Sequence, residues 1–255
     1  MASSYQIFMG GPVNAEFYSR ITTLEVEENA DLPGALQMRL PLARSAEGDL
    51  TEINEAGIQP LAPIAVVATA EGKPPECIFD GYVLSHKLHV ESGVTGAWVE
   101  VYAQDAAWLM NLEEKTREWA NTTDGLVANS IFGEYGVTPS PDNLNDDSPT
   151  HTEDGHTLMQ RATDIEFLRM LARRSGKLCR VAGGLAPGAP VGVFARPKLD
   201  TSPVANLRPN DPEAPNIRSL DIEWDVMRPT SVRARQALFT DDAADGARAD
   251  TDASG

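Results

Sequence analysis

The chain has 255 residues, of which 42% are hydrophobic and 23% are charged, a composition typical of a globular protein with one large or two modest domains. Acidic residues outnumber basic residues by 38 to 21, so the formal net charge is -17, and such a chain on average repels nucleic acid and anionic membranes. The cysteines, Cys77 and Cys179, are too few for a disulfide framework, and we expect both to be reduced and buried.

The sequence shows no signal for secretion or membrane insertion, and its C-terminal end differs in composition from the rest. The N-terminal residues lack the basic start and apolar core of a signal peptide, and no apolar run reaches the ~20 residues of a membrane span. We therefore expect assembly in the cytoplasm and no direct membrane insertion. Residues 241–255 are rich in Asp and almost free of large apolar residues, which predicts a flexible acidic tail.

Residues 1–105 are expected to be mainly strands. In GALQMRLPL, Leu36, Met38 and Leu40 share one face, which is the period of a half-buried strand. Gly81, inside the segment CIFDGYVLSHKLHV, predicts a bulge or a bend. Further strands are predicted in FYSRITTLEVEEN, IAVVAT and AWVEVYAQD. Because Gly and Pro turns connect these segments, we expect an antiparallel sheet or a small barrel.

Helical and extended signals mix in residues 106–182. AAWLMNLEEKTREWANTT has apolar residues at loosely helical spacing, and TTDGLVANSIFGEYG is a clearer helix, capped by Thr123 or Asp124 and ended by Gly136. Between Gly136 and His156, the Pro-, Asp- and Ser-rich sequence predicts an exposed, mobile loop. HTLMQRA, which follows, is expected to be short and to extend into the next helix.

The segment from Thr163 to Gly176 carries the strongest helix signal. Thr163 and Glu166 have capping-box spacing, and Gly176 supplies a left-handed stop. The acidic first turn and the arginines of the last turn match the helix dipole, so we interpret these arginines as a solvated face. The buried face is predicted to comprise Phe167, Leu168, Leu171 and Ala172. Strands are expected in KLCRVAG and in SLDIEWDVMRPTSVRARQALF, where Leu220, Ile222, Trp224 and Val226 alternate with charged residues.

Chemistry-bearing motifs are sparse. The sequence contains no nucleotide-binding loop, zinc-protease motif or nucleophile elbow. His86 and His89 lie three apart in a predicted strand and so point to opposite faces. The segment HTEDGH, with His151 and His156, leaves a metal-dependent hydrolase as an alternative, although polar loops collect such residues without binding anything. We assign no catalytic, cofactor-binding or metal-binding residue, and no exposed aromatic cluster indicates a carbohydrate- or receptor-binding module.

The order of the segments resembles the hub proteins of contractile tails. These include the late control protein D of phage tails and the gp27-like part of type VI secretion VgrG spikes. Supporting features are Gly81 in DGYV, Asp105 and the helix that ends at Gly136, and the resemblance covers residues 5 to 240. The most specific matches are Gln160, Thr163, Asp164, Phe167, Leu168, Leu171, Ala172 and Gly176.

This resemblance implies a non-enzymatic baseplate hub that joins a hexameric tail tube to a trimeric spike as a pseudo-six-fold trimer. Its partners would be two further copies of the chain, the tube protein, the spike protein and other baseplate proteins of a phage tail-like particle. The implied fold is β-rich α+β, with barrel-like tube domains around an α/β part. We expect a first tube domain in residues 1–105, the α/β part in 106–182, a short second tube domain in 183–240 and the tail in 241–255.

Overall fold

The computed structural model describes residues 4–43, 50, 56–91, 96–154, 157–198, 206–209, 212–223, 231–238 and 241–250. Its contacts divide the chain into two units, Met1–Leu199 and Asp200–Gly255. No helix among the described residues is both long enough and apolar enough to span a membrane.

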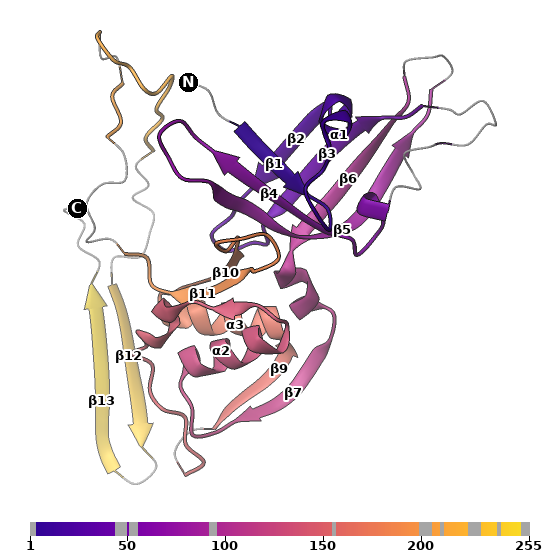
Figure 1. The fold of residues 1–255 in the computed structure, drawn as a ribbon. Helices are drawn as coiled ribbons and strands as arrows, with labels where there is room; N and C mark the ends of the chain where they lie inside the picture. Colours follow the sequence, from indigo (N-terminus) through magenta and orange to yellow (C-terminus); the bar gives the residue numbers. More distant parts are fainter. Residues whose placement is uncertain are drawn as a thin grey trace. The chain divides into compact units, whose positions relative to one another are not determined.

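A curled antiparallel sheet forms the N-terminal half of the first unit (Figure 1). Its six strands run in the order β1-β4-β5-β6-β3-β2. Their bounds are β1 (Ser4–Phe8), β2 (Thr23–Glu27), β3 (Ala35–Pro41), β4 (Pro63–Thr69), β5 (Glu76–His89) and β6 (Trp98–Asp105). The β-rich fold class and strands β2 to β6 are as predicted, whereas β1 lies in a segment for which no strand was predicted, and one strand is corrected. Helix α1 (Ala15–Arg20), capped by the Asn14 side chain, replaces the first residues of the strand expected in FYSRITTLEVEEN.

The alternation in β3 explains why this sheet has one buried face. Leu36, Met38 and Leu40 are fully buried, while Gln37 and Arg39 between them are partly exposed. The buried residues pack with Val99 and other apolar residues from β1, β4, β5 and β6 into one hydrophobic cluster.

Gly81 marks a close approach between neighbouring strands. A Cβ atom at this position would lie 2.1 Å from the backbone oxygen of Gln104 in β6, so only glycine fits. The irregularities in the ladder lie nearby, between Val66 and Val67 of β4 and between Val83 and Ser85 of β5. Bulges of this kind increase local twist and help a sheet to curl.

The C-terminal half of the first unit packs two helices against short strands. Its elements are η3 (Ala106–Asn111), β7 (Glu114–Trp119), α2 (Asp124–Glu134), β8 (Thr138–Pro139), η4 (Pro141–Leu144), β9 (Leu158–Thr163), α3 (Asp164–Arg174), β10 (Leu178–Ala182) and β11 (Val191–Ala195). β7 pairs with β9, and β10, β11 and β8 form a three-stranded sheet. A second hydrophobic cluster, which includes Ile131, Phe132, Phe167 and Phe194, lies among them.

Two predictions for this half are corrected. AAWLMNLEEKTREW is a 3-10 helix followed by strand β7, and HTLMQRA contains strand β9 rather than a helical extension. Residues of β7 alternate between exposed and partly buried, which is the period of a strand. Because most of these side chains are charged, the alternation does not appear as a pattern of hydrophobic residues in the sequence.

Helix α3 agrees with the prediction in detail. The capping box between Thr163 and Glu166 is present, and Gly176 has a positive φ of 65°. The four residues predicted for the buried face are at most 1% exposed. Helix α2 also forms with Thr123 as its cap, and its Leu126 is 49% exposed.

The second unit contains the hairpin of β12 (Ser231–Leu238) and β13 (Asp241–Asp250). β13 occupies part of the segment expected to be a flexible tail, since backbone pairing with β12 does not require large apolar side chains. The strand expected around Leu220 and Ile222 is absent from residues 219–223, where both side chains are exposed. Trp224 and Val226 lie outside the described residues.

Candidate functional site

A buried ionic network surrounds the start of α3. The Asp164 carboxylate is fully buried and accepts hydrogen bonds from Lys115 Nζ at 2.6 Å, Tyr135 Oη at 2.7 Å and Gln160 Nε2 at 2.6 Å. Gln160 in turn accepts a hydrogen bond from the Trp119 indole at 3.1 Å. Burial disfavours the charged carboxylate, but the three donors outweigh it and lower the pKa of Asp164. The network ties β7, α2, β9 and α3 together.

A second network surrounds the start of α2. Asp124 is 1% exposed, and its Oδ1 lies 2.6 Å from Arg174 Nη2 and 2.9 Å from His151 Nε2. The backbones of His151 and Thr122 also pair with each other. Arg174 therefore forms an ion pair with a buried carboxylate, which corrects its interpretation as part of a solvated face. Another arginine of α3, Arg173, pairs with Asp31 at 2.9 Å on the surface.

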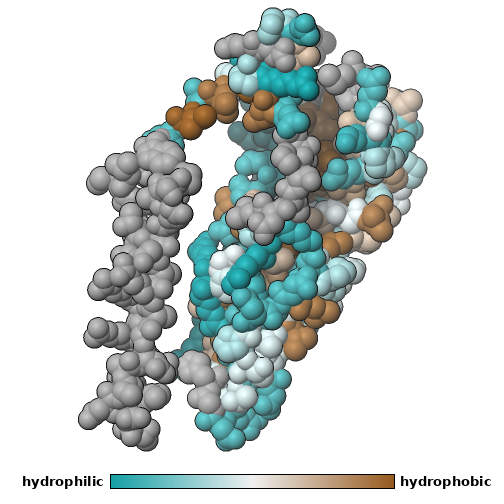
Figure 2. Space-filling view, turned by 90° about the vertical axis from the view of Figure 1, so that its left-hand side faces the viewer, coloured by the Kyte–Doolittle hydropathy of each residue, from teal (hydrophilic) through white to brown (hydrophobic). Residues whose placement is uncertain are grey.

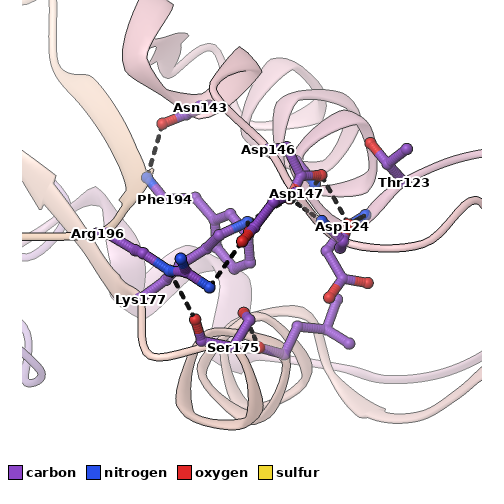
Figure 3. Close-up of polar contacts among 12 residues, drawn as sticks. Thr123, Asp124, Asn143, Asp146, Asp147, Ser175, Lys177, Phe194 and Arg196 are labelled. Atoms are coloured by element: carbon purple, nitrogen blue, oxygen red, sulfur yellow. Dashed lines mark hydrogen bonds and ion pairs between the residues drawn. The ribbon is translucent and has the colours of Figure 1, made fainter.

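The segment between α2 and β9 is largely exposed, as predicted, but polar side chains such as Asn143 and Asp146 anchor it to the rest of the unit (Figure 3). Asn143 is 1% exposed, and its Oδ1 accepts the Phe194 N–H at 2.7 Å. Asp146 forms an ion pair with Lys177, whose side chain is 1% exposed, and accepts the Gly125 N–H at 2.6 Å. Burial opposes the charged form of Asp146, but the Lys177 and backbone hydrogen bonds hold its pKa well below the usual range.

The outer part of this anchor is a surface ion pair. Asp147 pairs with Arg196 at 2.9 Å, and the Arg196 Nε donates to the backbone oxygen of Ser175 at 3.1 Å (Figure 3). These contacts join the segment to the end of α3 and to the residues after β11. The whole arrangement holds this surface in place by charge pairing and hydrogen bonds.

The histidines singled out in the sequence do not converge in the described part of the chain. His151 is buried against Asp124, whereas Glu153 and Asp154 are exposed, and His156 lies outside the described residues. Within the described residues, no group of three or more His, Cys, Asp or Glu side chains is arranged to hold a metal. The structure therefore does not describe how His151 and His156 lie relative to each other, and the metal-dependent hydrolase stays a prediction.

The other candidate residues lie on the sheet and in the core. His89 stacks on Trp98 with ring centroids 4.9 Å apart, and its Nε2 lies 3.0 Å from Glu91. Both cysteines are free and buried, as expected. Burial raises the pKa of the Cys77 thiol to about 11 and that of Cys179 to about 12, so neither is a nucleophile at neutral pH.

Two sheet edges are the clearest candidates for contact with other chains. Within the described residues, β1 and β2 each have a strand neighbour on one side only. At the β1 edge, the Ile7 N–H donates to the Tyr18 hydroxyl of α1 at 2.8 Å, which covers part of that edge. Hydrophilic residues predominate among the described residues on the face shown in Figure 2.

Several of the residues that build these features could not be recognised from the sequence. Lys115 and Lys177 gave no signal, because their buried partners Asp164 and Asp146 are 49 and 31 residues away. Asn143 lies in a sequence typical of an ordinary loop. A possible signal was the density of Asn and Asp directly after α2, since these residues often bond to backbone groups.

Comparisons with known proteins address the fold. Residues 4–208 match the family model described as the Alg8 N-terminal domain. No curated protein matches the chain. The structure is similar to a tail protein from Neisseria meningitidis, with 14% identity and a TM-score of 0.65, over 98% of this chain and 68% of that chain.

It is also similar to a 43 kDa tail protein of prophage MuSo2 from Shewanella oneidensis, with 15% identity and a TM-score of 0.52, over 75% of this chain. A type VI secretion component of E. coli, the c3393 protein, matches 78% of this chain and 48% of its own length at 14% identity, with a TM-score of 0.47. The chain spans 53% of the length of the Shewanella protein. The fold is therefore the fold of the two tail proteins.

Proposed function

We propose that this chain, which belongs to the Alg8 N-terminal domain family, is a structural component of a contractile tail or injection particle and acts as its hub. The observation that carries this proposal is the fold shared with the Neisseria tail protein over 98% of the chain. The buried ion pairs around α2 and α3 support it, because they tie helices and strands of the first unit together as a structural component requires.

In this proposal the hub is a homotrimer that joins a hexameric tube to a trimeric spike. Residues 1–105 would form the first tube domain, 106–182 the intervening part and 183–240 a short second tube domain. The edge of β2 is the better candidate for contact between copies, because α1 already covers part of the β1 edge. The complete particle would also contain other baseplate proteins.

The test is the mass of the purified chain alone and with the tube and spike proteins of the same particle, measured by native mass spectrometry. We expect a trimer and a larger complex with each partner. Reversing the exposed charges of β2 with Glu25→Arg and Glu27→Arg should reduce the trimer at least about tenfold. The matched control reverses two exposed glutamates away from the edges, Glu71→Arg and Glu113→Arg, and should leave it intact. A monomer that binds neither partner would contradict the proposal.

A further inference from the structure

A cavity lies on the face of the sheet that points away from its hydrophobic cluster. Phe8, Ala65 and Asp80 are directly opposite one another on β1, β4 and β5, so their side chains form one row across three strands. The Gly- and Pro-rich segment between β10 and β11 covers this row. Together they line a half-open cavity of about 300 Å³, with Pro63, Pro187 and Gly188 also in its walls.

Asp80 is the charged group of this cavity. It is 9% exposed, and its Oδ2 accepts the N–H groups of Gly188 at 2.7 Å and Ala189 at 3.1 Å. These bonds hold the covering segment in place. Burial raises the pKa of Asp80, while the two backbone hydrogen bonds act in the opposite direction. Both bonds are to Oδ2, which leaves Oδ1 without a hydrogen-bond donor among the described residues.

The other buried aspartates of this unit all have basic side chains nearby. Asp124 pairs with Arg174, Asp146 with Lys177 and Asp164 with Lys115. Burial raises the pKa of Asp105, and the nearby charge of Arg169 acts in the opposite direction. Asp80 has no basic side chain among its described interactions. A buried carboxylate is stabilised by an opposite charge, and Asp80 Oδ1 is free to accept a hydrogen bond from a cation in the cavity.

We propose that the cavity binds a primary ammonium group at the end of an unbranched aliphatic chain. The ammonium would donate to Asp80, and the methylene groups would lie against Phe8, Pro63 and Pro187. A volume near 300 Å³ is at the lower end of the range for small-ligand sites, which suits a narrow, unbranched aliphatic chain. The source is either a free alkylamine or a lysine side chain of another protein. This proposal does not depend on the hub function.

The test uses the full chain labelled with ¹⁵N and follows the amide resonances of Gly188 and Ala189 at pH 7 and constant ionic strength. The probes are n-pentylamine, its uncharged analogue n-pentanol and the tripeptide acetyl-Gly-Lys-Gly-amide. We expect saturable shifts with pentylamine and at least about tenfold weaker binding of pentanol. Saturable binding of the tripeptide identifies a lysine side chain as the source, and binding of pentylamine alone identifies a free amine. Shifts that do not saturate with either amine would overturn the proposal, as would equal binding of pentanol.

Two variants test the role of the carboxylate. Asp80→Asn keeps an oxygen for the Gly188 and Ala189 N–H groups but removes the charge, and it should weaken amine binding at least about tenfold. Glu71→Gln removes one exposed charge elsewhere and should leave binding unchanged. Equal amine binding by Asp80→Asn and the unsubstituted chain would refute the ion pair. If Asp80→Asn fails to fold, the comparison of pentylamine with pentanol on the unsubstituted chain shows whether binding requires the ammonium charge.

Discussion

Replacing Lys115 with methionine should strongly destabilise the first unit. Methionine keeps much of the length of the lysine side chain but removes the ammonium that lies 2.6 Å from the fully buried Asp164 carboxylate. Breaking a buried ion pair by removing one partner costs roughly 3–5 kcal/mol. Tyr135 and Gln160 still donate to Asp164, so we expect the lower part of that range, about 3 kcal/mol at pH 7.

The matched control is Arg117→Met, two residues away on the same strand. Arg117 pairs with Glu134 at 2.5 Å, but these side chains are 32% and 36% exposed. Such surface pairs contribute about 0–1 kcal/mol. The free energy of unfolding should be measured by urea titration, with tryptophan fluorescence as the signal, because Trp119 donates to Gln160 in the affected network.

The pH dependence of the free energy of unfolding gives an independent check of the Lys115–Asp164 ion pair. In the unsubstituted chain the pKa of Asp164 is below its ordinary value of 3.8, so its contribution to stability is present above that value and is lost as the pH falls through the folded pKa. In Lys115→Met, burial without the lysine should raise this pKa. The difference in stability between the two proteins should therefore shrink as the pH is lowered. If Lys115→Met costs no more than Arg117→Met at pH 7, the account of the network is wrong.

The remaining predictions concern the core, a buried acid and the C-terminus. Phe167→Ala should cost about 3–5 kcal/mol in urea unfolding, because the side chain is 1% exposed, and an unchanged midpoint would contradict the packing. The control Met170→Ala, on the exposed face of α3, should cost less than about 1 kcal/mol. Burial raises the pKa of Asp105 to about 6 from 3.8, so the folded state binds a proton more tightly and stability should fall as the pH rises through this window. Asp105→Asn should flatten that part of a melting-temperature profile, and a profile that keeps its slope would rule the assignment out. Deleting residues 241–255 should leave the melting temperature of the first unit unchanged, since both of its hydrophobic clusters end by Phe194; a large loss of soluble protein would show otherwise.

Elements whose signals are local were predicted well from the sequence. In α3, the capping box, the apolar spacing and the glycine stop all lie within Thr163–Gly176, and each indicates the same helix. The alternation in β3 is equally local, because its period of two directly reports one buried face. The fold class could therefore be predicted from a few segments of strong periodicity.

Features that depend on partners distant in the sequence were missed. The segment around Asn143 and Asp146 has the composition of a solvated loop, and only the contacts with Phe194 and Lys177 reveal that these two side chains anchor it. Strand β7 was assigned wrongly for a related reason. Its inward side chains, Lys115, Arg117 and Trp119, include two cations that pair with acidic residues of the helices, so hydrophobic periodicity did not reveal the strand.

The strand order of the sheet also has a consequence for synthesis on the ribosome. β3 pairs with β6, and the contacts Arg39–Glu100 and Gly34–Asp105 span 61 and 71 residues. Closing such long segments costs chain entropy before any contact repays it, so the sheet should form slowly. Until residue 105 has been synthesised, Leu36, Met38 and Leu40 have no β6 to cover them. The nascent chain therefore passes through an interval in which β3 is prone to aggregate, and a chaperone that binds extended apolar segments should associate with it there.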